Sequence, residues 1–215
     1  MKILQITAVA MTALMLSSPA VSQDQKMGTM PMKDSGAMHS SMGQGAMGHA
    51  AMTSSPNAAK AAYDHQFLDT MVAHHQGAVE MAQLAETRSA RDELKTLAKK
   101  MIEDQQSEIK QMQDWKAKWY AGKGDAMNMK MPGMHESMKG MSMDKIAASK
   151  GAAFDAMFID MMTKHHAGAV TMARNALKKA EHPEVKEIAK KMIDAQKEEM
   201  AQMKKWKAEW KVAKK

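Results

Sequence analysis

Two His-His pairs carry the most specific chemistry in the sequence, and each stands in the same local pattern. A methionine lies three residues before the first histidine of each pair, and a second methionine lies seven residues after it. The residues concerned are Met71, His74, His75 and Met81, and then Met162, His165, His166 and Met172. On a helix that turns about 100° per residue, His74 and His75 lie about 60° and 40° to either side of Met71. Each pattern can therefore direct two imidazoles and a thioether into one cavity.

The ligand types predict the metal. Imidazole accepts copper, zinc, iron or nickel, whereas thioether sulfur selects soft ions. The chain has no cysteine, which excludes thiolate catalysis, iron–sulfur clusters and a disulfide framework. We therefore expect Cu(I) as the bound ion, with Ag(I) or Cu(II) as alternatives. Met101 and Met192 are further candidate metal ligands. Packing is the competing interpretation for methionines on a buried helical stripe, and it applies to Met101, Met112, Met192 and Met203.

A second set of soft ligands lies between residues 127 and 143. It consists of Met127, Met129, Met131, Met134, His135, Met138, Met141 and Met143. The residues 23–57 are similarly rich in methionine, and neither stretch has Leu or Val anchors. We expect both to be flexible, and we expect the thioethers of the 127–143 stretch to contact metal rather than to pack in a core.

An internal duplication at a spacing of 91 residues organises the chain. Residues 64–119 align with 155–210 without a gap, and 27 of the 56 positions are identical. Apolar residues recur at helical spacing in each unit, which predicts helices near 58–87, 91–119, 146–179 and 184–212. One amphipathic hairpin has little to bury its apolar stripe against, so two hairpins predict an all-α, antiparallel four-helix bundle. Pairing of the helices brings Met101, Gln105 and Glu108 towards the imidazoles, where the polar groups can orient a ring.

The first 22 residues have the features of a secretory signal. A lysine precedes an apolar run from Ile3 to Leu16, and small residues follow. Later stretches are too short and too polar to cross a bilayer, so we expect a periplasmic or extracellular protein. The net charge of +7 is spread along helices and does not indicate a nucleic-acid partner.

The repeated motif resembles a known family. The pattern Asp-x-x-Phe-x-x-x-Met-x-x-His-His-x-Gly-Ala-Val-x-Met-Ala occurs at 64–82 and 155–173, and it is similar to the bacterial domain-of-unknown-function family 305. This resemblance implies a ferritin-like fold and a role like that of periplasmic copper-binding proteins of the CopM type. The expected role is copper sequestration, trafficking or resistance, with copper efflux or oxidase proteins as partners. The resemblance also implies that the eight Met and His residues of the motif face the metal.

The resulting domain prediction has five parts. They are a signal peptide at 1–22, a Met/His-rich flexible arm at 23–57, a helical hairpin at 58–120, a Met-rich linker at 121–145 and a second hairpin at 146–215, the two hairpins forming one bundle.

Two other functions remain open. The first is a ferritin-like di-metal redox enzyme, which needs Glu-x-x-His motifs facing inward. Met71 and Met162 stand in the place of that glutamate, so we expect no enzyme. The second is a metal-independent helical scaffold for an acidic partner, which the lysine-rich helix faces permit but which does not explain the sulfur-dense segments.

Overall fold

The computed structural model describes residues 53–210, and the regular structure in this range is entirely helical. The elements are a 3₁₀ turn η1 (Ala58–Lys60), α1 (Tyr63–Gln83), α2 (Ala85–Arg88), α3 (Asp92–Trp119), α4 (Met134–Met138), α5 (Met143–Ala148), α6 (Gly151–Lys179) and α7 (Pro183–Glu209). The predicted all-α class is confirmed. The first predicted helix is divided, because the chain before Tyr63 is a turn and α2 is separated from α1 at Leu84.

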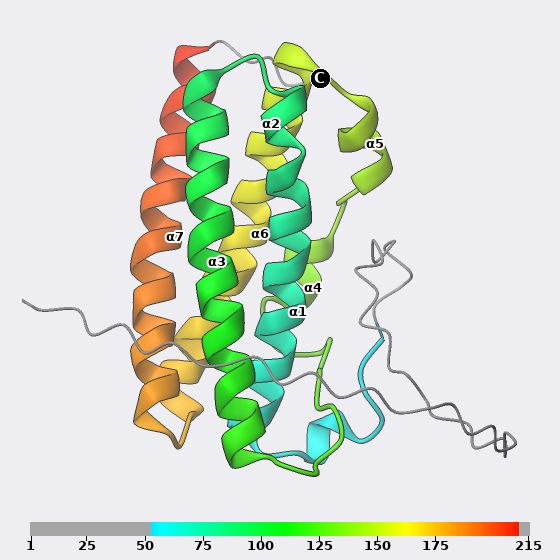
Figure 1. Cartoon of the computed structure of the whole chain (residues 1–215), viewed down its shortest axis with the longest axis vertical. Helices are drawn as coiled ribbons and strands as arrows, with labels where there is room; N and C mark the ends of the chain where they lie inside the picture. The colour runs from blue at the N-terminus through cyan, green and yellow to red at the C-terminus, as the bar shows by residue number, and fades with distance from the viewer. Residues whose placement is uncertain (1–52, 211–215) are drawn as a thin grey trace, which may run out of the picture. The chain divides into compact units, whose positions relative to one another are not determined.

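Four long helices lie side by side and follow the duplication (Figure 1). The first hairpin is α1 packed on α3, the second is α6 packed on α7, and α1 and α6 join the two hairpins. In Figure 1, α1 and α7 run in one direction and α3 and α6 in the other. The two helices that carry the His-His pairs are therefore antiparallel neighbours, which brings the pairs together.

The junction before α7 shows how one hairpin is fixed to the other. Pro183 occupies the first turn of α7, where its missing N–H costs nothing. The buried carboxylate of Asp64, in the first turn of α1, accepts hydrogen bonds from the backbone N–H groups of Glu181 and His182 and bonds the His182 ring at 2.6 Å. This carboxylate ties the start of the first hairpin to the turn of the second.

The linker is ordered, which corrects the prediction of a flexible segment. It forms α4 and α5, and Met131 and Met134 are buried in the core. At Gly133 the backbone has φ 98°, and a Cβ atom placed there would lie 2.3 Å from the carbonyl oxygen of Gly168. Two glycines thus let α4 approach α6 at backbone distance, and methionine side chains fill the space beside them, so the segment needs no Leu or Val.

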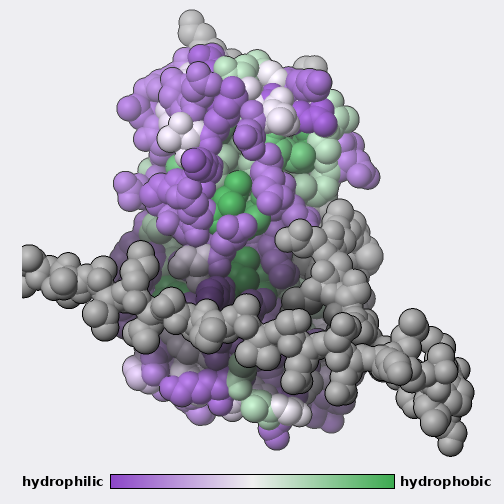
Figure 2. All heavy atoms as spheres, viewed as in Figure 1, coloured by the Kyte–Doolittle hydropathy of each residue, from purple (hydrophilic) through white to green (hydrophobic). Residues whose placement is uncertain are grey.

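Hydrophilic side chains cover most of the face seen in Figure 2, and hydrophobic ones show between them near its middle. No helix within residues 53–210 has the length and apolar character to span a membrane. The predicted signal peptide and residues 23–52 of the predicted arm lie outside the described residues.

Candidate metal centre

Four imidazoles meet where α1 and α6 cross. His74 and His75 come from α1, His165 and His166 come from α6, and all four are buried. The ring centroids of His74 and His165 lie 3.6 Å apart, with the ring planes tilted by 35°. Each of these rings neighbours the second histidine of its own pair, at 6.2 and 6.4 Å between centroids. The duplication therefore builds one imidazole cluster from both repeats.

Carboxylates on the outer helices hold the second histidine of each pair. Glu108 of α3 lies 2.7 Å from Nε2 of His75, and Glu199 of α7 lies 2.7 Å from Nε2 of His166. A carboxylate oxygen accepts this hydrogen bond from an Nε2–H group, and Nδ1 of each ring is buried without a hydrogen-bond partner among the described residues. The expectation that Glu108 reaches an imidazole is confirmed, and the same contact recurs in the second repeat. Carboxylate–imidazole pairs of this kind orient histidines that bind metals.

The environment keeps His74 neutral. Burial lowers the pKa of His74 well below its ordinary value of 6.5, and the neighbouring imidazoles of His165, His75 and His166 lower it further. Neutral imidazole is the form that binds a metal ion. His74 is therefore able to act as a ligand at neutral pH without first losing a proton.

Several polar atoms in this region are buried without a hydrogen-bond partner. They include both ring nitrogens of His74, Nδ1 of His75 and Nδ1 of His166, together with the side-chain oxygens of Gln105 and Gln196. A buried polar group left unpaired costs about 1–3 kcal/mol. A concentration of such groups lowers the stability of the fold. It is typical of sites where these groups bind a ligand.

The motif methionines are fully buried and divide into two groups. Met71 belongs to the same hydrophobic cluster as Met172 and Met192, whereas Met162 belongs to the cluster of Met81 and Met101. Each cluster thus contains methionines of both repeats, with Met112 a further member of the first cluster and Met161 and Met203 further members of the second. Met200, which the sequence did not single out, packs against both clusters.

The linker residues occupy three kinds of place. Met131 and Met134 belong to the cluster of Met71, with Met129 and Met138 packed against it. Met141 and Met143 pack against the cluster of Met162. Met127 is half-buried and His135 is exposed, so the structure does not bring the linker ligands together at one point.

The arrangement differs from a carboxylate-bridged di-metal centre. Within residues 53–210 no group of three or more His, Asp or Glu side chains is placed to hold a metal ion. Glu108 and Glu199 are each directed at an imidazole instead. Thioether sulfur is the soft donor present in the same core.

The sequence profile described as "Domain of unknown function (DUF305)" matches residues 5–116 and 64–207. The chain belongs to this family. A search of the curated proteins gives no match. Solved structures do match, and they include members of the same family.

Three of the solved structures define the likeness. CopM in the Cu(I)-bound form is 35% identical with a TM-score of 0.59, and the match covers 68% of this chain and 96% of that one. CopM in the Ag-bound form, obtained by co-crystallisation, gives the same four values. A putative secreted DUF305 protein from Streptomyces coelicolor is 28% identical with a TM-score of 0.62, covering 69% of this chain and 93% of that one. The family fold is therefore shared over about two thirds of the chain.

Proposed function

We propose that this chain is an exported copper-binding protein that holds Cu(I), and also Ag(I), for sequestration, trafficking or resistance. The observation that carries the proposal is the central cluster of His74, His75, His165 and His166, in which Glu108 and Glu199 fix the second ring of each pair. The likeness to CopM supports it, because CopM has been solved in Cu(I)-, Cu(II)- and Ag-bound forms.

We assign the ligands by position in the core. Imidazoles of the four-histidine cluster supply nitrogen, at most two of them to one ion as the described side chains stand, and the two methionine groups supply sulfur from the hydrophobic clusters. These groups are Met71 with Met172 and Met192, and Met162 with Met81 and Met101. Thioether and neutral imidazole bear no charge. When they bind a monovalent ion, the only charge buried in the core is therefore the single charge of the ion.

The linker supplies further ligands closer to solvent. Met127, Met129, Met138, Met141 and Met143 are half-buried, and His135 is exposed. These side chains are placed to capture an ion before it reaches the core. Met131 and Met134 are buried in the cluster of Met71. Their sulfur atoms can therefore bind only an ion that has already reached the core.

The place of action follows from the export signal expected at residues 1–22. A periplasmic location agrees with the use of thioethers rather than thiols, because thiols oxidise to disulfides in such compartments. The likeness to a putative secreted member of the family supports the same location. Delivery to copper efflux or oxidase proteins remains part of the proposal.

A Cu(I) titration tests the proposal. The full chain competes with a chromogenic Cu(I) chelator under anaerobic, reducing conditions, beside a variant carrying His74→Asn and His165→Asn and a His135→Ala variant. We expect the double variant to lose at least tenfold in affinity, with His135→Ala changing it much less. Far-UV circular dichroism establishes that each variant is folded. Affinity no greater than that of weak chelators, or affinity unchanged in a folded double variant, contradicts the proposal.

A further inference from the structure

A cleft of about 640 Å³ opens between α5 and the first half of α6, away from the four imidazoles. Asp155, Met157, Asp160 and Met161 of α6 form one side. Lys145 of α5 contributes to the other, and Trp210 at the end of α7 also lines the cleft. The volume is in the range of sites that bind a ligand of several residues or a drug-sized molecule.

The duplication provides a counterpart of this cleft, and there a segment of the chain fills it. In the first repeat, the positions equivalent to Met157, Asp160 and Met161 are occupied by Gln66, Asp69 and Thr70 of α1. These three side chains bind the extended segment 126–129. The backbone N–H of Ala126 donates to Asp69 Oδ2 at 2.7 Å, that of Asn128 donates to Thr70 Oγ1 at 2.8 Å, and the Asn128 side chain donates to Gln66 at 2.7 Å.

The filled slot has a second wall, formed by residues 54 and 55. The N–H of Met129 donates to Ser54 Oγ at 3.0 Å, and the N–H of Ser55 donates to the carbonyl of Met127 at 2.8 Å. Segment 126–129 thus lies between α1 and residues 54–55, as the cleft lies between α6 and α5.

We propose that the cleft binds an extended segment of a partner protein that carries methionine and an acidic residue. The segment would lie on α6 as residues 125–129 lie on α1. Thioether and apolar side chains would contact Met157, Met161 and Trp210. Methionine surfaces adapt to flexible apolar guests, whereas the polar Gln66 and Thr70 of the first repeat fit one particular asparagine.

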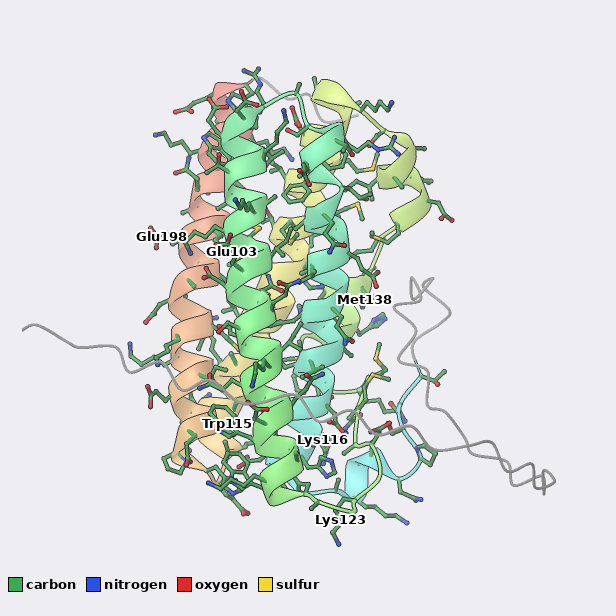
Figure 3. All side chains as sticks on the ribbon, viewed as in Figure 1. Glu103, Trp115, Lys116, Lys123, Met138 and Glu198 are labelled. Carbon is green, nitrogen blue, oxygen red and sulfur yellow. The ribbon has the colours of Figure 1, made fainter. Side chains whose placement is uncertain are left out.

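The basic side chains that line the cleft are the reason for proposing an acidic residue in the guest segment. In the filled slot, Asp125 pairs with Lys116 at 2.7 Å, and Lys116 also pairs with Asp69 (Lys116 is labelled in Figure 3). Lys207 and Asp160 form the equivalent pair at the cleft. Arg91 lies over the Trp210 ring at 4.9 Å. Lys145 and Lys164 line the cleft as well, and neither forms an ion pair with another residue in the range 53–210. An acidic guest would supply the missing partner.

A buried acceptor at the cleft is also unsatisfied. Asp155 Oδ1 accepts from Ser89 at 2.6 Å, whereas its Oδ2 is buried without a donor among the described residues. Its counterpart Asp64 accepts three hydrogen bonds from residues 181 and 182 on Oδ2 alone. Residues 181 and 182 correspond to residues 90 and 91, so by equivalence this carboxylate belongs to the turn before α3, and the docking does not depend on it.

Fluorescence anisotropy tests this docking with the full chain in a buffer that holds a Cu(I) chelator. The probe is a labelled peptide with the sequence of residues 125–131, which includes the segment 126–129 that fills the first slot in the protein itself. We expect saturable binding to the full chain. Filling the cleft by Met161→Trp should weaken it at least tenfold, and the double change Lys145→Glu and Lys164→Glu should weaken it severalfold. Lys99→Glu, an exposed change on α3, should leave it unchanged.

A control peptide has both outer methionines replaced by serine and the aspartate replaced by lysine, and it should not bind. Absence of saturable binding by the probe, or binding that Met161→Trp does not alter in a folded variant, overturns the proposal. Self-association of the chain that Met161→Trp abolishes would also overturn it, because the cleft would then hold a second copy. Because no metal is present, failure here is distinct from failure of the copper titration.

Discussion

The close approach of α4 to α6 predicts opposite effects for the same substitution at two equivalent glycines. Gly168→Ala would place a Cβ atom 2.4 Å from Ser137 Cβ and 2.5 Å from the carbonyl oxygen of Gly133. At the equivalent position of the first repeat, the Cβ of Gly77→Ala would meet only His165 Nε2, at an ordinary 3.9 Å. Both glycines are helical, where alanine is favoured by about 1 kcal/mol.

The expected magnitudes follow from these contacts. Gly77→Ala should stabilise the chain by up to about 1 kcal/mol, because nothing opposes the helix propensity. Gly168→Ala gains the same term but must displace the backbone of α4, and overpacking of this kind costs about 1–3 kcal/mol. The two variants should therefore differ by about 1–3 kcal/mol in free energy of unfolding, with Gly168→Ala the less stable.

Urea unfolding followed by far-UV circular dichroism, in the presence of a metal chelator, measures this difference. Gly133→Ala serves as a second variant, because it meets the Gly168 carbonyl from the other side and also has φ 98°. It should be at least as destabilising as Gly168→Ala. Equal unfolding free energies for Gly77→Ala and Gly168→Ala would show that α4 does not pack on α6 in solution. The conclusion that the linker is ordered would then be wrong.

Three other predictions address the site, the core and the titration of the chain. Glu199→Gln and Glu108→Gln should each lower Cu(I) affinity about 10- to 100-fold in a chelator competition; Glu198→Gln and Glu103→Gln, whose side chains lie outside the core in Figure 3, should leave it unchanged. Met134→Ala should destabilise the chain by about 2–5 kcal/mol in urea unfolding, because it opens a cavity in a buried cluster; a loss below about 0.5 kcal/mol would contradict burial of the linker. Burial, and secondarily Asp64, raises the pKa of Tyr63 from 10.0 to about 12. The folded state then retains a proton that the unfolded state loses, so this contribution to stability is complete below pH 10 and is lost as the pH rises from 10 to about 12. Absorbance at alkaline pH should show a tyrosine that ionises near 12, and complete titration near 10 would refute this.

The sequence was sufficient to predict the helices because their burial pattern is local and repeated. Phe67, Met71 and His74 recur at three- and four-residue steps, and the same steps occur 91 residues later. Similarly, Glu108 was placed on the stripe that faces the imidazoles, where it bonds His75. A helical period fixes which side chains share a face, so both inferences required only spacing.

The linker could not be predicted in the same way, because its order comes from tertiary contacts. Gly133 and Gly168 are 35 residues apart in the sequence, and neither indicates by itself that the other lies against it. The sequence predicts metal contact for the linker methionines, which stays a prediction, and the structure shows that Met131 and Met134 also fill the core that leucine would fill elsewhere. Residue type alone does not distinguish a thioether that packs from one that binds, whereas burial and neighbours do.

The exchange of methionines between the repeats has a consequence for how the centre must form. Met71 shares a cluster with two methionines of the second hairpin, and Met162 shares one with two of the first. The closest pair of imidazoles, His74 and His165, also comes from different hairpins. Neither hairpin contains a complete set of neighbours, although each contains the full motif. Under the proposed function, a centre that uses His74 and His165 together forms only after α1 and α6 have packed, and the duplication then joins two half-sites.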